Sequence, residues 1–217
     1  IQKRHGNFTV RSSKMKLAVI GGGSTYTPEL IDGIIKRNAR LPISEVYLLD
    51  ITTERVSVIA AFASRMLKAA GKDISIQYGT NLDEAIKGAD VFIGVSAANV
   101  LSENDIKQMA INSIVFALAN PDPEIDPAIA RKYAAVVATG RSDQPNQINN
   151  VLAFPGIFRG LLDANAHKIT DNLLVAAAEA IANCVAPEQL NTNFIIPSVF
   201  DPNVAKEVAA AVKSASK

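Results

Sequence analysis

Six short apolar runs recur along the chain, separated by segments that have the spacing of amphipathic helices. Polar residues interrupt the runs little, which is typical of parallel strands that are covered on both faces. Parallel neighbours need crossover connections, which are right-handed and usually helical. The pattern therefore predicts an α/β fold with a doubly wound, Rossmann-type parallel sheet in the order 3-2-1-4-5-6. The expected strands are residues 16–20, 45–50, 74–78, 90–95, 113–119 and 134–139.

Helix signals fill the connections and the last third of the chain. A helix is expected after Pro28, and a second from Thr52 or Thr53 to Lys68. The strand signal fades after Thr139, and the remaining residues are expected to form a helical carboxy-terminal extension. We interpret residues 1–14 as a leader or loose arm and 15–217 as a single Rossmann-type domain. The other expected helices are residues 81–87, 102–110, 127–132, 151–164, 170–185 and 202–215.

The amino-acid composition limits which kinds of partner the chain is expected to bind. The net charge is +1, from 22 basic and 21 acidic residues, so no electrostatic feature favours nucleic acid or a membrane surface. No apolar run approaches the roughly 20 residues of a membrane helix. The one cysteine, Cys184, cannot form an internal disulfide, which favours a cytoplasmic location. A homo-oligomer is compatible with the sequence.

The stretch from Leu17 to Leu30 reads LAVIGGGSTYTPEL and raises the question of cofactor binding. Gly21 and Gly23 fill the first two places of a Gly-x-Gly-x-x-Gly turn, but Tyr26 occupies the third. Such a turn brings backbone N–H groups and a helix N-terminus against a pyrophosphate. We expect Tyr26 to push the helix outward or to bend the turn, without removing the anion site.

Asp50 ends the second predicted strand. A carboxylate at that place accepts hydrogen bonds from both hydroxyls of an adenosine ribose and repels a 2′-phosphate. The sequence therefore favours NAD over NADP. The alternative is a solvent-facing turn followed by an acidic residue at the end of a strand.

The glycine motif and the residues around it resemble those of a known family. Residues 15–89, with the run MKLAVIGGGSTYTPELIDGIIKR, resemble the amino-terminal segment of glycoside hydrolase family four. Those enzymes, 6-phospho-beta-glucosidase among them, depend on NAD and a metal, and they carry an aromatic residue at the third-glycine place. The resemblance implies cofactor contacts from five residues, which are Gly21, Gly22, Gly23, Ser24 and Asp50.

Residues 90–217 resemble a different family, the carboxy-terminal part of bacterial malic enzymes. The matching runs are DVFIGVSAANVL, FALANPDPEI, VVATGRSDQPNQINNVLAFPGIFRG and FIIPSVFDPNVA. Malic enzymes oxidise and decarboxylate malate with NAD(P) and a divalent metal. The resemblance implies that Ser96, Asn120 and Asn149 contact the cofactor. Asn120 and Asn150 would bind malate or another small dicarboxylate. The structural alternatives are a turn-forming Asn-Pro at Asn120 and helix capping at Asn149 and Asn150.

Two resemblances that meet at residues 89 and 90 predict a chimera, spliced within one sheet. No residue fits the catalytic or metal-binding motifs of either family, so we predict no catalytic and no metal site, and glycosidase activity is not expected. We expect Cys184 in the core and His167 at the surface. Arg141, Asp143 and Asp122 are expected in a solvated loop, with recognition of substrate charge as the alternative.

The first functional interpretation is an NAD-binding domain without a complete catalytic apparatus. One alternative is an NAD-dependent malate oxidoreductase of malic enzyme type. Another is a purely structural recombinant that binds no ligand.

Overall fold

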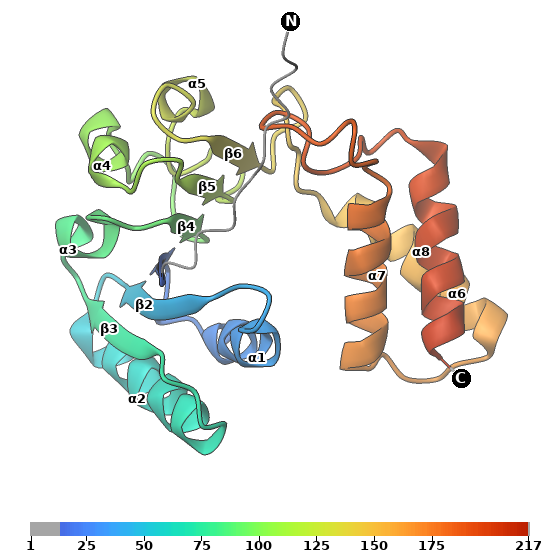
Figure 1. Ribbon diagram of the computed structural model, residues 1–217, viewed down its shortest axis with the longest axis horizontal. Helices are drawn as coiled ribbons and strands as arrows, with labels where there is room; N and C mark the ends of the chain where they lie inside the picture. Colours follow the sequence, from blue (N-terminus) through green and yellow to red (C-terminus); the bar gives the residue numbers. More distant parts are fainter. Residues whose placement is uncertain (1–13, 217) are drawn as a thin grey trace, which may run out of the picture. The chain divides into compact units, whose positions relative to one another are not determined.

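The computed structural model describes residues 14–216 and contains a parallel sheet (Figure 1). The strand order is β3-β2-β1-β4-β5-β6, as predicted. The chain divides into two compact units, the first ending at Val91 and the second beginning at Phe92, and each is described by itself. This boundary lies close to residues 89 and 90, where the resemblance changes. The single domain over 15–217 stays a prediction, and nearly all of the predicted leader lies outside the described residues.

The first unit holds the first three strands. Its elements are β1 (Met15–Ile20), α1 (Thr27–Arg37), β2 (Ile43–Leu49), α2 (Thr53–Ala69), β3 (Ser75–Gly79) and α3 (Leu82–Ile86). β1 pairs with β2 in parallel, with Ile20 opposite Leu49. β2 pairs with β3 in the same sense. Because paired parallel strands end at one edge, the turn after Ile20 and the residue after Leu49 lie beside each other.

The helices of this unit form for reasons of local sequence. Pro28 occupies the first turn of α1, where no backbone N–H is needed. The buried residues of α2 are spaced by three or four, which gives one apolar face toward the strands. They are Val56, Ala60, Ala63 and Leu67. This face holds α2 in place, and Figure 1 shows α2 beside β3.

The second unit begins within β4 (Val91–Gly94) and continues with α4 (Glu103–Gln108), β5 (Ile114–Ala117), α5 (Pro127–Ala130) and β6 (Val136–Thr139). β5 and β6 pair in parallel. Phe92 and Val115 are fully buried, whereas Ile93 and Phe116, which point to the opposite face, are only half-buried. One face of these strands is therefore covered less than the apolar runs predicted.

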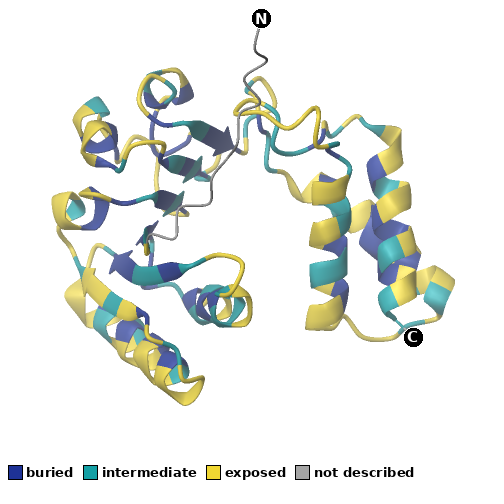
Figure 2. Ribbon diagram, viewed as in Figure 1, coloured by how far each residue is buried: buried dark blue, intermediate teal, exposed yellow. Residues whose placement is uncertain are grey.

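A helical bundle completes the second unit, as predicted. Its elements are a 3₁₀ turn η1 (Asn150–Leu152), α6 (Phe154–Ala164), α7 (Asp171–Asn183) and α8 (Pro202–Ala215). Their shared core includes Leu152, Leu173 and Val208, and Figure 2 shows the facing sides of these helices buried. None of the helices within residues 14–216 has the length and apolar character needed to cross a membrane.

Two glycines let α6 and α8 approach closely. A Cβ added to Gly156 would lie 2.5 Å from the Cβ of Val208, and one added to Gly160 would lie 2.6 Å from the carbonyl oxygen of Ala209. Four residues apart, both glycines lie on the same face of α6. The backbones of α6 and α8 therefore lie too close together for any side chain at these two positions.

Candidate cofactor site

The glycine turn is tied to the end of β2. Gly21 has φ of +88°, a left-handed conformation that glycine adopts without a steric cost. The backbone N–H groups of Gly21 and Gly22 both donate to the carbonyl oxygen of Leu49, at 2.9 and 2.8 Å. The turn thus leaves β1 sharply and crosses over the last residue of β2.

Gly22 and Gly23 lie so close to neighbouring residues that a side chain would not fit at either position. A Cβ on Gly22 would lie 2.9 Å from the Cα of Leu48, and one on Gly23 would lie 2.5 Å from Oδ2 of Asp50. In the sequence, these glycines belong to a turn that brings its backbone against a pyrophosphate. The structure adds a different reason, because both glycines are buried against β2 and the residue after it.

Asp50 is held by backbone hydrogen bonds. Its Oδ2 accepts from the N–H of Gly23 at 2.8 Å, and its Oδ1 accepts from the N–H of Ile51 at 2.8 Å. The side chain is half-buried beside the turn. A carboxylate offers about four lone-pair positions, so each oxygen keeps the capacity to accept from a ribose hydroxyl. The arrangement fits the predicted role of Asp50. The two backbone hydrogen bonds fix the orientation of its carboxylate before a ligand binds.

The groups available for a pyrophosphate lie at Ser24 and Thr25. The Oγ of Ser24 accepts from the N–H of Tyr26 at 3.2 Å, which leaves its own proton free to donate. Within residues 14–216 the backbone N–H of Thr25 has no hydrogen-bond acceptor. Thr25 is exposed and was not singled out from the sequence, although its place inside the turn is a usable signal.

Tyr26 does not obstruct the turn. Its side chain is 74% exposed at the start of α1, so its bulk lies in solvent and not between helix and strand. The hydroxyl of Thr27 donates to the carbonyl oxygen of Gly22 at 2.8 Å and joins the helix start to the turn. The aromatic ring is therefore accommodated in solvent at the start of α1, and a displacement of the helix stays a prediction.

In the second unit, a buried carboxylate joins the ends of two strands. Glu124 is fully buried. Its Oε1 accepts from the N–H and the hydroxyl of Ser96, at 3.0 and 3.3 Å, and its Oε2 accepts from the N–H of Ala119 at 3.0 Å. Glu124 therefore fixes the segments after β4 and β5, which carry the predicted residues Ser96 and Asn120. Sequence reasoning missed it.

Asn120 is exposed and precedes a cis peptide bond to Pro121. It lines a small cavity of about 290 Å³ in the second unit together with Arg141 and Asp143. Arg141 donates to both carboxylate oxygens of Asp143, at 2.9 and 2.8 Å, and lies 3.7 Å from Asp122. These hydrogen bonds lower the pKa of Asp143 to about 2 and raise the pKa of Arg141. The charge of Arg141 is therefore already paired, which agrees with a solvated loop.

The adjacent residues Asn149 and Asn150 have different surroundings. The Oδ1 of Asn149 accepts from the N–H of Val151 at 3.1 Å, so Asn149 caps η1 as the structural alternative predicted. Asn150 is exposed in the first position of η1. Neither residue lines the cavity beside Asn120. A third asparagine that we had not singled out, Asn146, is buried and donates to the carbonyl oxygens of Val137 and Thr192.

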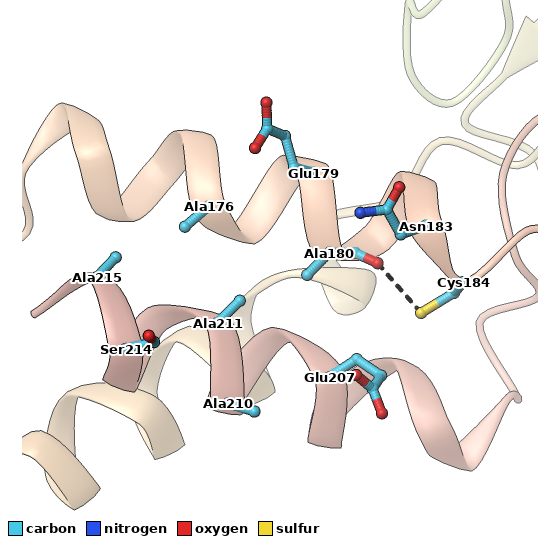
Figure 3. A pocket seen from close by; sticks show the side chains of 10 residues that line it. All are labelled: Ala176, Glu179, Ala180, Asn183, Cys184, Glu207, Ala210, Ala211, Ser214 and Ala215. Atoms are coloured by element: carbon cyan, nitrogen blue, oxygen red, sulfur yellow. Dashed lines mark hydrogen bonds between the residues drawn. The ribbon is translucent and has the colours of Figure 1, made fainter.

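A larger groove of about 600 Å³ lies between α7 and α8, and half of its lining residues are alanines (Figure 3). Cys184 lies at one end, partly buried, with its thiol donating to the carbonyl oxygen of Ala180. Burial raises the pKa of this thiol, which agrees with the packed position that we expected. His167 is exposed, also as expected.

Within residues 14–216, no group of three or more His, Cys, Asp or Glu side chains is placed to hold a metal ion. The residues described here thus do not fit the metal that both family resemblances imply.

The sheet order, the glycine turn and the aspartate after β2 define a doubly wound, NAD-binding domain. Residues 30–216 match the family described as "Malic enzyme, NAD binding domain". The chain belongs to this family. The match runs across residues 89 and 90, and the chimeric origin stays a prediction.

Known relatives agree with this assignment. The chain is 57% identical over 136 residues to the NAD-dependent malic enzyme of Geobacillus stearothermophilus, covering 63% of this chain and 28% of that protein. It is 53% identical over 137 residues to the bifunctional malic/malolactic enzyme of Bacillus subtilis, covering 63% of this chain and 33% of that protein. The chain thus spans about a third or less of the length of these relatives.

Solved structures give the same fold. The NAD-dependent malic enzyme of Thermotoga maritima matches with a TM-score of 0.69 and 37% identity, over 92% of this chain and 51% of that one. A 6-phospho-alpha-glucosidase from gut microorganisms matches with a TM-score of 0.53 and 18% identity, over 71% of this chain and 42% of that one, which shows the fold alone. Together the matches favour the malic enzyme alternative over a domain that lacks a catalytic apparatus.

Proposed function

We propose that the chain is the NAD-binding part of a malate oxidoreductase of malic enzyme type, which oxidises and decarboxylates malate. The match of residues 30–216 to the malic enzyme NAD-binding family is the observation that carries this proposal. The chain spans only part of its relatives, so the activity of a whole malic enzyme is proposed for it by similarity.

The first unit carries the groups proposed for the adenosine and the pyrophosphate of the cofactor. Asp50 accepts from the ribose hydroxyls, while Ser24 and the N–H of Thr25 donate to the pyrophosphate. Gly21, Gly22 and Gly23 keep the turn close to β2. Asp50 is oriented by two backbone N–H groups, so it needs little reorganisation on binding. The bound cofactor supplies the nicotinamide that accepts a hydride.

The second unit supplies the polar groups proposed for the nicotinamide and the substrate. Ser96, Asn120 and Asn149 contact the cofactor, and Asn120 and Asn150 donate amide hydrogen bonds to a carboxylate of malate or of another small dicarboxylate. The support for Ser96 and Asn120 is that both adjoin backbone fixed by Glu124. The amides of Asn120 and Asn150 are exposed, which leaves them accessible to a ligand.

Malate-dependent formation of NADH tests the proposal. The chain is incubated with NAD, malate and Mn²⁺, and NADH absorbance is monitored. We expect a slow rate, proportional to the amount of chain and lost in Asn150→Ala. A slow rate is expected because the chain spans only about a third or less of the length of its malic enzyme relatives. NAD binding without any NADH formation would instead support the binding domain without catalysis, and no NAD binding would support the purely structural alternative.

The finer predictions from the sequence stand as part of this proposal. The run GGGSTYTPEL and the change of resemblance after residue 89 support a two-parent origin for the chain. A homo-oligomer is supported by an exposed apolar stripe on α6, formed by Phe154, Phe158 and Leu162. A cytoplasmic location rests on the single cysteine alone.

A further inference from the structure

We propose that Arg55 is a latent binding group for a 2′-phosphate, and that the balance between Asp50 and Arg55 decides the choice between NAD and NADP. The inference rests on the proposed cofactor site and concerns its specificity. Arg55 lies in the first turn of α2. Its Nε donates to the carbonyl oxygen of Gly23 at 3.1 Å, so the guanidinium is anchored at the glycine turn.

Asp50 and Arg55 contact the same residue. A Cβ added to Gly23 would lie 2.5 Å from Oδ2 of Asp50 and 3.2 Å from Cγ of Arg55. A carboxylate and a guanidinium therefore flank Gly23. Asp50 is the residue proposed to hold the ribose hydroxyls, so Arg55 is a cation that lies beside the proposed ribose site, where NADP carries its additional phosphate.

The guanidinium is available for a ligand. Among the residues that the structure describes, the two oxygens of Asp50 accept from backbone N–H groups and form no ion pair with Arg55. The only hydrogen bond of Arg55 within residues 14–216 uses Nε, and the side chain is exposed. Both terminal nitrogens thus remain free, in the planar geometry that suits a phosphate.

The two charges act in opposite directions on NADP. Asp50 repels a 2′-phosphate and accepts from the 2′-hydroxyl of NAD, so the native chain prefers NAD. Arg55 attracts the same phosphate but is opposed by the nearby carboxylate. Removal of the negative charge at Asp50 should therefore expose an NADP site that is already formed. No new cation has to be introduced.

Binding titrations of Asp50→Asn test the inference. This variant removes the charge and keeps an oxygen that can accept from the N–H of Gly23. Calorimetry with NADP should show an affinity about tenfold higher than that of the native chain. The second substitution Arg55→Gln should remove this gain, whereas Arg55→Lys should retain part of it. Arg65→Gln is the matched control, because Arg65 is an exposed arginine on the same helix, roughly 15 Å along its axis.

Equal NADP affinity of Asp50→Asn with and without Arg55→Gln would overturn the inference, and so would an equal loss with Arg65→Gln. If Asp50→Asn does not fold, judged by circular dichroism, Asp50→Ser replaces it with the same expected order of affinities. NAD binding to the native chain distinguishes a failure of this inference from a failure of the proposed function. If NAD binds and Arg55 has no effect on NADP, only this inference fails. If the native chain binds neither NAD nor NADP, the proposed function fails with it.

Discussion

At the scale of the residue, Gly23 shows how packing and binding share one position. The motif predicted a glycine there for the sake of the cofactor, but Asp50 and Arg55 already occupy the space that a Cβ would need. The N–H of Gly23 also orients the carboxylate that we assign to the ribose. A substitution at Gly23 should therefore disturb Asp50 first and cofactor binding as a consequence.

We predict that Gly23→Ala destabilises the chain by about 1–3 kcal/mol, the usual cost of overpacking, and weakens NAD roughly tenfold. Gly33→Ala is the matched control, since a Cβ there meets only the terminal nitrogen of Arg37, at 3.7 Å. Because Gly33 lies within α1, its replacement by alanine should stabilise by about 0.5–1 kcal/mol. Urea denaturation and NAD titration measure both effects. Equal behaviour of the two variants would contradict the packing argument.

Asp143 gives a prediction about pH. Hydrogen bonds from Arg141 lower its pKa from 3.8 to about 2. A lowered pKa in the folded state means that the interaction is fully present above pH 3.8 and is lost as the pH falls through about 2. A carboxyl NMR titration of the native chain should therefore give a midpoint near 2, and Arg141→Gln should return it toward 3.8. A midpoint near 3.8 in the native chain would show that the pair does not form in solution.

At the scale of the element, the close contact between α6 and α8 depends on the absence of side chains. Sequence reasoning predicted both helices, but not that Gly156 and Gly160 would form their contact. Glycine within a helix usually indicates a weak point, and only the partner helix shows why it is needed. Sequence spacing alone does not identify that partner.

Gly156→Ala should destabilise the chain by about 1–3 kcal/mol, because the added methyl group would overlap Val208. Val208→Ala alone should also destabilise, because it removes buried atoms from the core of the bundle. The double variant should be somewhat more stable than the sum of the two losses predicts, because Val208→Ala removes the Cγ1 atom at 2.6 Å from the added methyl group but keeps the Cβ at 2.5 Å. Strictly additive values in a denaturation cycle would refute a direct contact.

Glu124 is the clearest example of a residue that the pattern could not reveal. Its segment reads PDPE and indicates a polar turn, yet Glu124 is fully buried. One backbone donor is Ala119, five residues earlier in the same connection after β5, and the other is Ser96, 28 residues earlier, after β4. The bond to Ser96 leaves no local periodicity in the sequence. The strands and helices were predictable because their signals are local. The apolar runs predicted strands covered on both faces, but Ile93 and Phe116 are only half-buried, because coverage of a sheet face depends on elements elsewhere in the chain.

We expect Glu124→Gln to destabilise the chain by about 1–3 kcal/mol, because the amide turns a donor toward a backbone N–H that needs an acceptor. Glu188→Gln, at an exposed position, should change stability by less than about 0.5 kcal/mol. Chemical denaturation of both variants, with unchanged m-values, provides the comparison. A loss no larger than that of the control would show that Glu124 does not join the two segments.

At the scale of the whole molecule, the fold and the family agree. The sheet order was predictable from the alternation of apolar runs and helices, and the malic enzyme family covers residues 30–216. Individual cofactor contacts could be proposed from the sequence only where a turn motif and the end of a strand coincide, as at Gly21 and Asp50, and they stay predictions. The roles of Asn120, Asn149 and Asn150 rest on resemblance, because side-chain amides serve turns and caps equally well.

The central claim is that NAD binds at the glycine turn with Asp50 on its ribose, and calorimetric titration of NAD tests it most directly. The native chain should bind NAD saturably and in preference to NADP. Asp50→Ala should weaken NAD by about 1–3 kcal/mol, the scale of hydrogen bonds to a charged group. Saturable binding with no loss in Asp50→Ala, or no saturable binding at millimolar NAD, would contradict the site.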